Sequence, residues 1–336
     1  MRRIVLLVSG ITVFSCAPLP PVAFLPGADV EPPVITGLRL LSAVELEVSF
    51  NEPIRLVSGP RHPESVALEE AVVEALVLLV RFAEPPTPEH EHYVEAQVSD
   101  VAGNNLRFVV RFYGLNTLLP AMLINEFITK HSANHGEFVE IRILSDGNLA
   151  GATLHEGIPG DWDQRFIFPS VDVVAGDYVV VHFRPQGIPE EVNETVDRAI
   201  SGGRNASPDA WDFWVNGGTG LSSNNGVLTL CENPLGGYID AVLYSNRTSD
   251  SDDRYRGFGS TRLMERADAI VTAGAWVASS VTAAPEDAID SGPSTATRSM
   301  SRASDGRDTN SRADWHITPT RGSTPGGSNT DEVHVP

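Results

Sequence analysis

The sequence contains very little cysteine and almost no lysine. Among its 336 residues are two cysteines, Cys16 and Cys231, and a single lysine, Lys130. Two cysteines exclude a disulfide-rich scaffold and a zinc site built from several thiolates. Cys231 lies in an apolar stretch, where we expect a small buried hydrophobic residue.

Positive charge is also scarce, with 24 basic residues against 44 acidic ones and a net charge of -20. Nucleic acid is therefore not an expected partner, because phosphate binding needs a basic face. The same argument excludes a broad electrostatic attraction to anionic lipid. The hydrophobic content of 41% is sufficient for packed cores, and the length allows two domains.

The start of the chain has no apolar run long enough to cross a bilayer. Residues 4–14 are apolar but fall short of the roughly 20 residues that a spanning helix needs. A basic pair at positions 2 and 3 precedes this run, and Cys16 closes it. This order predicts a signal peptide over residues 1–15. A tether made semi-rigid by proline follows over residues 16–33.

The four residues that end at Cys16, Val-Phe-Ser-Cys, resemble a bacterial lipobox. Phe14 makes the pattern looser than usual, which is typical of spirochaete lipoproteins. The resemblance implies cleavage before Cys16, lipidation of its sulfur and acylation of the new amino end. Two or more acyl chains anchor a protein stably, here to a membrane of the bacterial envelope, on the periplasmic face or the cell surface. The alternative is an ordinary cleaved signal peptide with an incidental cysteine.

Residues 34–114 are expected to form a β domain. Apolar and polar residues alternate over residues 44–50, which predicts a half-buried strand. Residues 72–82 form either one buried strand or a bent pair of strands. The pieces SAVELEVSFNEPI and YVEAQVSDVAGNNL resemble bacterial Ig-like domains. Asp100 and Asn104 in the second piece predict a turn, with a calcium site there as an alternative.

Residues 120–329 are expected to form a larger β domain around a hairpin at residues 226–244. Two apolar runs flank a turn around Pro234, and each run places its apolar side chains on one face. We therefore expect a hairpin with one buried face. A lone hairpin is not stable, so further strands are expected. They are predicted at residues 123–128, 137–141 and 176–183, the last of them central to its sheet.

A series of short motifs in this segment resembles the bacterial form of the lamin-tail domain. In chain order they are INEF, GEFVEI, AGDYVVVHF, LSSNNGVLTLCENPLGGYIDAVLYS, SMSR, TNSRADWH and STPGGSN. The resemblance implies an Ig-like β-sandwich. Residues 185–214 and 249–288 depart from the family as long loop insertions, and the second has room for a short amphipathic helix. Residues 286–313 are expected to be extended or mobile, and residues 330–336 disordered.

The most concentrated group of metal-ligating residue types is Glu126, His131, His135, Glu137 and Glu140. The two histidines are four residues apart, as in zinc-binding helices, but the glutamate that follows the first histidine in zinc proteases is absent. The segment between them is also a predicted loop. One hypothesis is a divalent-metal site. The other is a set of structural or solvated side chains, since the lamin-tail pattern carries Glu126 and Glu140 as sheet residues.

A second group of oxygen side chains consists of Asp305, Asp308, Asn310 and Asp314. Such alternation is typical of calcium loops, but the EF-hand spacing and its closing glutamate are missing. The acidic run at residues 250–253 is similar. We therefore expect no cofactor, with bound calcium as the alternative to surface charge in turns.

Other patterns do not assemble a catalytic group. Asp161 and Asp163 place two carboxylates on one side of any strand, but a short loop is the preferred interpretation over an acid–base pair. The chain has no Gly-x-Ser-x-Gly nucleophile motif and no phosphate-binding glycine loop with its lysine. The aromatic residues Trp211, Phe213 and Trp214 predict either core packing or a binding patch for carbohydrate or protein.

The expected fold class is all-β, with two tandem Ig-like β-sandwich domains after a lipoprotein signal peptide and a tether. The expected function is that of a lipid-anchored, non-enzymatic envelope protein that serves protein interaction, adhesion or scaffolding. Its expected partners are the membrane, through lipidated Cys16, and an envelope or host protein.

Two alternative functions remain open. The first is a carbohydrate- or peptidoglycan-binding module that uses Trp211 and Trp214. The second is a divalent-metal-dependent hydrolase or its accessory, because lamin-tail domains occur beside secreted nucleases and phosphatases. Subtracting the two β modules leaves no segment here for such a catalytic domain, which favours the interaction protein.

Overall fold

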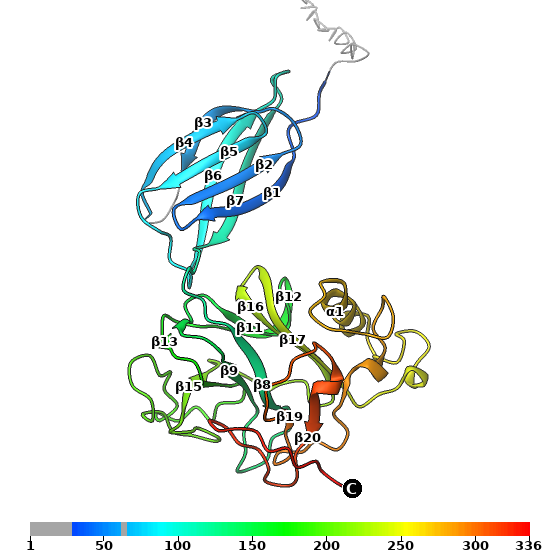
Figure 1. Ribbon diagram of the computed structural model, residues 1–336. Helices are drawn as coiled ribbons and strands as arrows, with labels where there is room; N and C mark the ends of the chain where they lie inside the picture. Colours follow the sequence, from blue (N-terminus) through cyan, green and yellow to red (C-terminus); the bar gives the residue numbers. More distant parts are fainter. Residues whose placement is uncertain (1–28, 62–65) are drawn as a thin grey trace, which may run out of the picture.

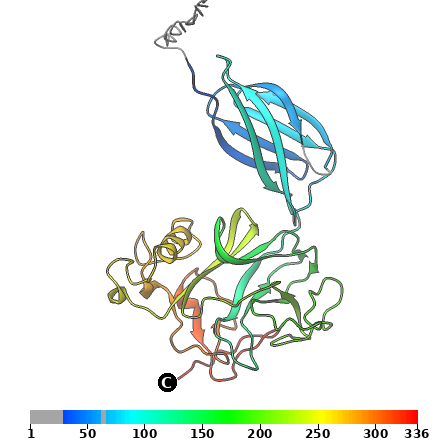
Figure 2. The same cartoon turned by 180° about the vertical axis from the view of Figure 1, so that it is seen from behind.

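The computed structural model describes residues 29–61 and 66–336 and contains two β domains in tandem (Figure 1). A narrow neck joins the domains, as the view from behind also shows (Figure 2). The fold is all-β, as predicted, and each domain places its core between two sheets. The predicted signal peptide, Cys16 and most of the tether lie outside the described residues.

The first domain consists of two antiparallel sheets with the strand orders β1-β2-β5-β4 and β3-β6-β7. The strands are β1 (Ile35–Ser42), β2 (Glu45–Phe50), β3 (Arg55–Arg61), β4 (Leu68–Glu74), β5 (Val77–Phe82), β6 (Glu91–Ser99) and β7 (Asn105–Tyr113). The turn between β4 and β5 contains Ala75, which has a φ of 52°. Residues 72–82 are therefore a bent pair, not one strand.

Alternating side chains build the core of the first domain. In β2, Leu46, Val48 and Phe50 are buried and the residues between them are partly exposed. This is the period of two that a strand imposes when one face is covered. The buried side chains of β2 form one cluster with Val94 and Phe108 from the opposite sheet. The predicted half-buried strand is confirmed.

The second domain consists of a five-stranded and a six-stranded sheet, with the orders β12-β11-β16-β17-β18 and β15-β14-β9-β8-β19-β20, and a ribbon β10-β13. The smaller sheet contains β11 (Thr153–Ile158), β12 (Asp161–Ile167), β16 (Asn225–Asn233), β17 (Gly236–Ser245) and β18 (Ile289–Asp290). The remaining strands are β8 (Met122–Ile128), β9 (Phe138–Ile143), β10 (Gly147–Asn148), β13 (Asp172–Val173), β14 (Tyr178–His182), β15 (Ala210–Trp214), β19 (Met300–Arg302) and β20 (Trp315–Ile317). The helices are α1 (Thr261–Thr272) and three 3-10 turns, η1 (Ser249–Ser251), η2 (Pro285–Asp287) and η3 (Arg312–Asp314).

Strands β16 and β17 form the predicted hairpin. Strand β14 was expected at the centre of its sheet and lies next to its edge, paired on both sides with β15 and β9. The expectation of a single buried face is wrong. Leu228 faces the main core, and Thr229 on the opposite face is also fully buried. Helix α1 packs against β16 and β11 and adds Ala267 and Ile270 to the core (Figure 1). A second layer therefore covers the face that was predicted to meet solvent.

Helix α1 is the short amphipathic helix predicted within residues 249–288. Ser260 caps it, because its hydroxyl accepts a hydrogen bond from the Leu263 amide at 3.2 Å. The helix has 12 residues. Within residues 29–61 and 66–336, no helix has the length and apolar character needed to cross a membrane.

The outer face of the six-stranded sheet is covered by two loop segments, residues 184–209 and 318–329. Beneath them lies a small apolar cluster that includes Phe138, Val180 and Ala210. Ala210 begins β15, so the predicted loop insertion at residues 185–214 ends in a strand of this sheet. The covering segments explain how polar side chains on this face come to be buried.

Two segments that composition predicted to be mobile are ordered. Residues 286–313 contain β18 and β19, and Arg302 in β19 is fully buried. Residues 330–336 run past β20, where the His334 amide donates to the Ile317 carbonyl at 2.7 Å. Polar composition misled the prediction, because these polar side chains bind buried partners in place of water.

At the neck the two domains approach each other closely at a glycine, Gly151. A Cβ at Gly151 of the second domain would lie 2.6 Å from the carbonyl oxygen of Pro88 in the first. The linker is fixed to the second domain by Asn116, whose side chain donates to the Asn148 and Ala150 carbonyls at 2.7 and 2.9 Å. Gly151 is therefore one point of close approach, and the turn around Leu235 of the second domain, which shares a pocket with Leu40 of the first, is another.

Candidate functional site

Two predicted metal-ligand candidates, Glu126 and Glu140, face each other across β8 and β9, fully buried. Glu126 accepts a hydrogen bond from the Thr324 amide at 2.9 Å, and Glu140 accepts one from the Gly326 amide at 2.6 Å. Burial raises the pKa of Glu126 to about 7. Burial and the neighbouring Glu126 charge raise the pKa of Glu140 well above its usual value. The pair holds the STPGGSN segment against the sheet.

The histidines of the same predicted metal site lie elsewhere. His131 Nδ1 is 2.9 Å from Glu137 Oε1, and the other Glu137 oxygen accepts the Leu221 amide. His135 is partly exposed in the loop between β8 and β9. In the described part of the chain these side chains and Glu126 do not come together as a group of three ligands. The predicted divalent-metal site is not assembled by this fold.

Two members of the predicted calcium group, Asp308 and Asp314, lie at the guanidinium of a buried arginine, Arg302. Its Nη2 donates to Asp240 at 2.9 Å and its Nη1 to Asp308 at 3.0 Å, with Asp314 at 3.6 Å. Its Nε donates to the Ile124 carbonyl at 2.7 Å. Burial raises the pKa of Asp240 to about 6, and the Arg302 charge opposes this rise. An arginine cation therefore neutralises two of the aspartates that were predicted to bind calcium, Asp308 and Asp314.

The remaining members of that group serve the turns around Arg302. The Asp305 side chain accepts the Arg307 amide at 2.9 Å, and the Asn310 amide donates to Asp308 at 2.9 Å. In the acidic run at residues 250–253, Asp252 pairs with Arg247 at 3.2 Å. These carboxylates are satisfied by local partners.

Asp161 and Asp163 lie on β12, not in the short loop that was expected. Arg266 of α1 binds both, at 3.0 Å to Asp161 and 2.7 Å to Asp163, and Arg262 binds both as well. The hydrogen bond from Arg262 contributes most to lowering the pKa of Asp161. Carboxylates held ionised in this way clamp α1 onto the five-stranded sheet.

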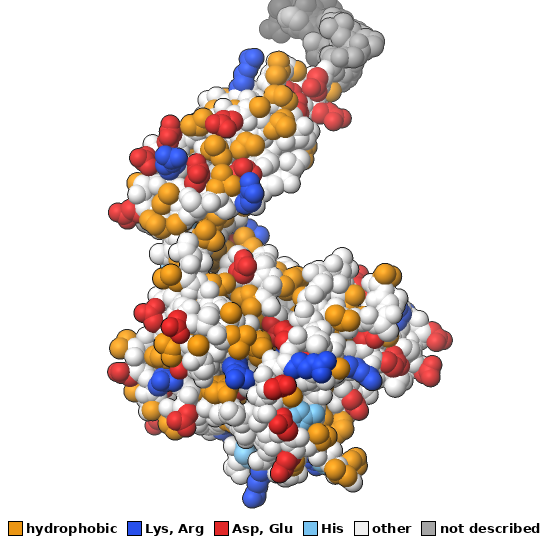
Figure 3. Space-filling model, in the orientation of Figure 1, with side chains coloured by type: hydrophobic (Ala, Val, Ile, Leu, Met, Phe, Trp, Pro, Cys, Tyr) orange, Lys and Arg blue, Asp and Glu red, His pale blue; other side chains and the backbone are white. Residues whose placement is uncertain are grey.

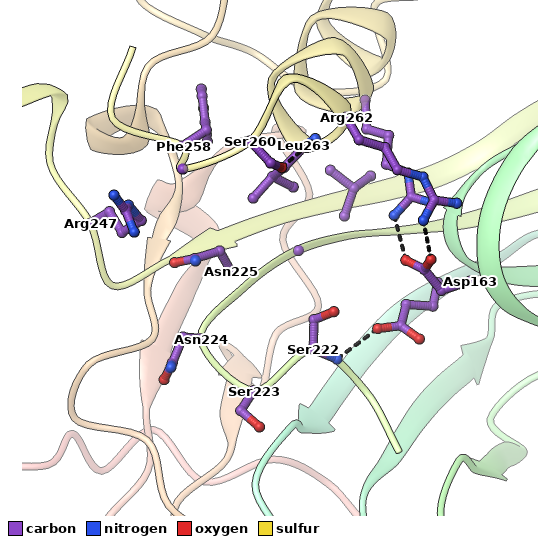
Figure 4. Close-up of a pocket in the computed structure, with 15 residues that line it drawn as sticks. Asp163, Ser222, Ser223, Asn224, Asn225, Arg247, Phe258, Ser260, Arg262 and Leu263 are labelled. Atoms are coloured by element: carbon purple, nitrogen blue, oxygen red, sulfur yellow. Dashed lines mark hydrogen bonds and ion pairs between the residues drawn. The ribbon is translucent and has the colours of Figure 1, made fainter. Parts of the chain in front are cut away.

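Beside this clamp, a polar cleft of about 420 Å³ separates the start of α1 from β16 (Figure 4). Its walls present hydroxyl and amide side chains, among them Ser222, Ser223, Asn224, Asn225 and Ser260. Three arginines also line it, and each is ion-paired with an aspartate. The cleft therefore suits a neutral, hydroxyl-rich ligand better than an anion.

The predicted aromatic patch does not form. Strand β15 alternates, so Phe213 and Trp211 pack against the main core while Trp214 lies on the opposite face. Trp214 is 6% exposed and stacks on His182 with ring centroids 3.8 Å apart. Core packing, the other hypothesis, describes these residues, because a strand cannot place neighbouring side chains on one face.

Two buried pairs escaped the sequence analysis. His182 Nε2 lies 2.7 Å from Asp212 on the neighbouring strand, and the second Asp212 oxygen accepts the Ser207 amide at 2.8 Å. The other pair is Asp240 with Arg302. Asp212 alternates with aromatic residues in β15, which is the one signal in the sequence that marks it as buried and paired.

Cys231 and His155 are both fully buried on β16 and β11. Burial raises the pKa of the Cys231 thiol to about 12 and lowers the pKa of His155 to about 4. Both groups are therefore neutral near pH 7, and the prediction that Cys231 is a small buried hydrophobic residue is confirmed.

In the first domain, Asp29, Glu52 and Asp100 bring carboxylate oxygens within 4.8 Å of one another. Asp100 closes the predicted turn, since it accepts the Gly103 and Asn104 amides at 2.6 and 2.8 Å. Partial burial and the charges of Asp100 and Asp29 raise the pKa of Glu52. Of the two residues named for the alternative of a calcium site at this turn, Asp100 belongs to this group of three acids and Asn104 does not.

An apolar groove of about 510 Å³ lies where the edges of the two sheets approach each other. One wall comes from β18 and the residues after it, and the other from β20. Residues that line the groove include Ile289, Asp290, Pro293, Trp315 and Ile317, with Val333 from the end of the chain. Hydrophobic side chains lie beside a histidine at the lower edge of the second domain, where the chain ends (Figure 3).

The fold and its buried ion pairs define the second domain as a two-sheet, sandwich-like β module. Residues 120–317 match the model of the family TP_1001_2nd, described as a protein second domain. The chain belongs to this family.

A protein of Treponema pallidum (strain Nichols), described as an uncharacterized protein, is 30% identical over 209 residues, which is 60% of this chain and 52% of the relative. The chain thus spans about half the length of the curated relative it matches. The crystal structure of dimeric latent PorU from Porphyromonas gingivalis matches at 13% identity with a TM-score of 0.17, over 65% of this chain and 19% of that chain. A likeness of that size supports no argument about fold or function.

Proposed function

We propose that this chain is a lipid-anchored, non-enzymatic protein of the bacterial envelope whose second domain binds another protein. The observation that carries the proposal is the apolar groove between β18 and β20. It lies at two sheet edges, where strands offer backbone groups to a partner. Two arginines beside it, Arg298 and Arg312, form no ion pair within 4 Å among the described residues, although the whole chain carries a charge of -20.

As part of this proposal, we assign the first domain to the bacterial Ig-like domains and the second to the lamin-tail domains. Support comes from how the quoted motifs meet. Glu126 of INEF and Glu140 of GEFVEI accept amides of STPGGSN. Arg302 of SMSR pairs with Asp240 of the hairpin motif.

The membrane anchor is proposed from the sequence that ends at Cys16. The match with a Treponema pallidum protein supports it, because a looser lipobox is typical of spirochaetes. The test is phase partitioning of Cys16→Ser in a detergent that separates on warming, with metabolic labelling by palmitate. We expect the variant to move to the aqueous phase and to lose the label. Unchanged partitioning and labelling would exclude lipidation at Cys16.

Protein binding is tested by crosslinking in intact cells, followed by mass spectrometry of what is recovered with the chain. We expect a reproducible partner protein crosslinked through residues 120–329. Recovery of the chain alone, or of glycan fragments only, would contradict the proposal. The Cys16→Ser chain, released from the membrane, is the control for contacts that arise from membrane crowding.

Carbohydrate binding is a second candidate function, and the polar cleft at the start of α1 favours it. Hydroxyl and amide side chains line this cleft, and its arginines are neutralised by aspartates. A glycan array tests the idea with Asn224→Ala and Ser223→Ala, two exposed positions in the cleft. Sugar binding that is lost in these variants would support this candidate. An array without signal for the unchanged chain would exclude it.

A further inference from the structure

We propose that the groove between β18 and β20 binds an extended acidic–apolar segment of a partner protein, and that residues 330–336 of this chain occupy the same place as a displaceable substitute. This inference rests on the proposed function and specifies its site. It adds the chemistry of the partner and a reason why residues 330–336 lie along the groove in this structure.

The groove exposes the outer edge of β20. Strand β20 pairs with β19 on one side only and is the last strand of its sheet. On its outer side, the His334 amide donates to the Ile317 carbonyl at 2.7 Å. An added strand binds to such an edge through main-chain hydrogen bonds, and its alternate side chains enter the neighbouring pocket. The chain's own segment already makes the first of these bonds.

The second argument is that this segment fills the site poorly. Val333 lines the groove and is nevertheless 57% exposed, and Val335, two residues further on, is 82% exposed. The groove retains about 510 Å³ beside them. A segment with a larger apolar residue at the position of Val333 would bury more surface in the groove than this valine does, at roughly 25 cal/mol per Å².

The third argument is a buried donor without an acceptor. Trp315 lines the groove and is 9% exposed, and its indole Nε1 has no hydrogen-bond partner among the described residues. Leaving such a donor unpaired costs on the order of 1–3 kcal/mol. A ligand carbonyl or carboxylate that reaches this nitrogen from the groove would supply the missing acceptor.

Charge identifies the chemistry of the partner. Arg298 donates to His334 at 2.9 Å, and Arg312 lines the groove. Neither forms an ion pair within 4 Å with a described carboxylate. The chain's own segment carries Asp331 and Glu332 just before its two valines, but Asp331 accepts hydrogen bonds from Ser304 and leaves both arginines to a partner. Because Asp290 also lines the groove, the matching partner segment places its acidic residues at Arg298 and Arg312, away from Asp290, and its apolar residues in the groove.

The experiment uses a fluorescent heptapeptide with the sequence of residues 330–336 as the probe. Two forms of the chain open the groove: one that ends at Asn329, and the full-length double variant Val333→Asp, Val335→Asp. We expect the peptide to bind both forms, and to bind the unchanged chain at least 10-fold more weakly. A tethered segment competes at an effective concentration in the millimolar range. A peptide with aspartate in place of both valines is the control and is expected not to bind.

Three results would overturn the inference. The first is that the peptide binds neither opened form, although the tryptophan fluorescence and melting temperature of each opened form show that it is folded. The second is equal binding to the opened and unchanged chains. The third is exchange of residues 330–336 between two copies, seen as a dimer by light scattering that the double variant abolishes. The occupant would then be a second copy and not a partner.

Crosslinking in cells separates this inference from the proposed function. If the captured partner is unchanged when Arg312→Glu closes the rim to acidic residues, protein binding stands and the groove is the wrong site. If no partner is captured at all, the proposed function itself fails. Arg254→Glu, an exposed arginine on another loop, is the matched charge control.

Discussion

The Asp240 carboxylate and the Arg302 guanidinium lie 2.9 Å apart, fully buried, between the two sheets of the second domain. Asp240 belongs to β17 of the five-stranded sheet, and Arg302 belongs to β19 of the six-stranded sheet. The pair thus joins the two layers of the sandwich through charge. Arg302 also lies over the Trp315 ring, with its guanidinium carbon 4.6 Å from the ring centre. It connects the core of the domain to the groove.

Loss of Arg302 is expected to destabilise the second domain strongly. Arg302→Met removes one partner of a buried pair and leaves the aspartates without their cation. We expect a loss of about 3–5 kcal/mol in the free energy of unfolding. Urea unfolding followed by tryptophan fluorescence measures it, since all five tryptophans lie in the second domain. Arg307→Met is the control, because the Arg307 side chain is 66% exposed and its nearest carboxylate oxygen, on Asp314, is as far away as 4.0 Å. A change below about 1 kcal/mol in Arg302→Met would contradict the role of the pair.

The Glu126–Glu140 pair is expected to make stability fall as pH rises from about 4.5 to 7. The folded chain keeps a proton on Glu126, whose pKa is raised to about 7, while the unfolded chain releases it near 4.5. The stabilisation that this retained proton gives the folded chain is fully present below pH 4.5 and is of order 3 kcal/mol. His155, with its pKa lowered to about 4, acts in the opposite direction between pH 4 and 6.5.

A variant separates the effect of Glu126 on the pH dependence of stability from that of His155. Glu126→Gln keeps the shape and removes the titration, so its stability is expected to decline less between pH 5 and 7 than that of the unchanged chain. Glu265→Gln, on the exposed side of α1, is expected to leave the slope unchanged. Urea unfolding at several pH values measures the slopes. Parallel slopes for all three chains would show that the buried pair does not retain the proton.

Gly326 is expected to tolerate no side chain. Its φ is 83°, and a Cβ there would lie 2.3 Å from the Ser207 hydroxyl. Gly326→Ala is expected to cost about 2–4 kcal/mol through strain and overlap, because two covering loops meet at this point. Gly327→Ala, whose nearest neighbour would be 3.6 Å away, is expected to cost less than about 1 kcal/mol. The melting temperatures of the two variants measure these losses. Equal losses would show that Ser207 does not approach Gly326 closely.

The angle between the domains is expected to depend on Gly151. A Cβ at this position would overlap Pro88 of the first domain. Gly160 has a similar φ, 86° against 79°, but nothing lies within 4 Å of its Cβ position. Both alanine variants carry the same backbone strain, so a change in the small-angle scattering curve of Gly151→Ala alone reports the junction. Identical curves for both variants would mean that the domains do not meet there.

Periodicity predicted the strands well because burial on one face leaves a direct record in the sequence. Residues 44–50 alternate and form the predicted half-buried strand, and the 226–244 hairpin forms as predicted although both of its faces are buried. The covering layers left no such record. Helix α1 lies far along the chain from β16, and nothing local to Thr229 indicates that a helix will bury it.

The polar sites were harder to predict because their partners are remote in sequence. Asp308 and Asp314 resembled a calcium group, yet their cation is Arg302, which no spacing rule connects to Asp240. The groove was not predictable at all. It exists only where two sheet edges and residues 330–336 come together, and composition had predicted that last segment to be disordered.

Site-specific photo-crosslinking in intact cells tests the central claim most directly. A photoreactive amino acid replaces Asp290, an exposed residue of β18 that lines the groove, or Val196, which is 81% exposed on the loop that covers the other sheet. The account predicts one adduct of defined mass from position 290 and none from position 196. Adducts from position 196 alone, or the same adducts from both positions, would contradict binding in the groove.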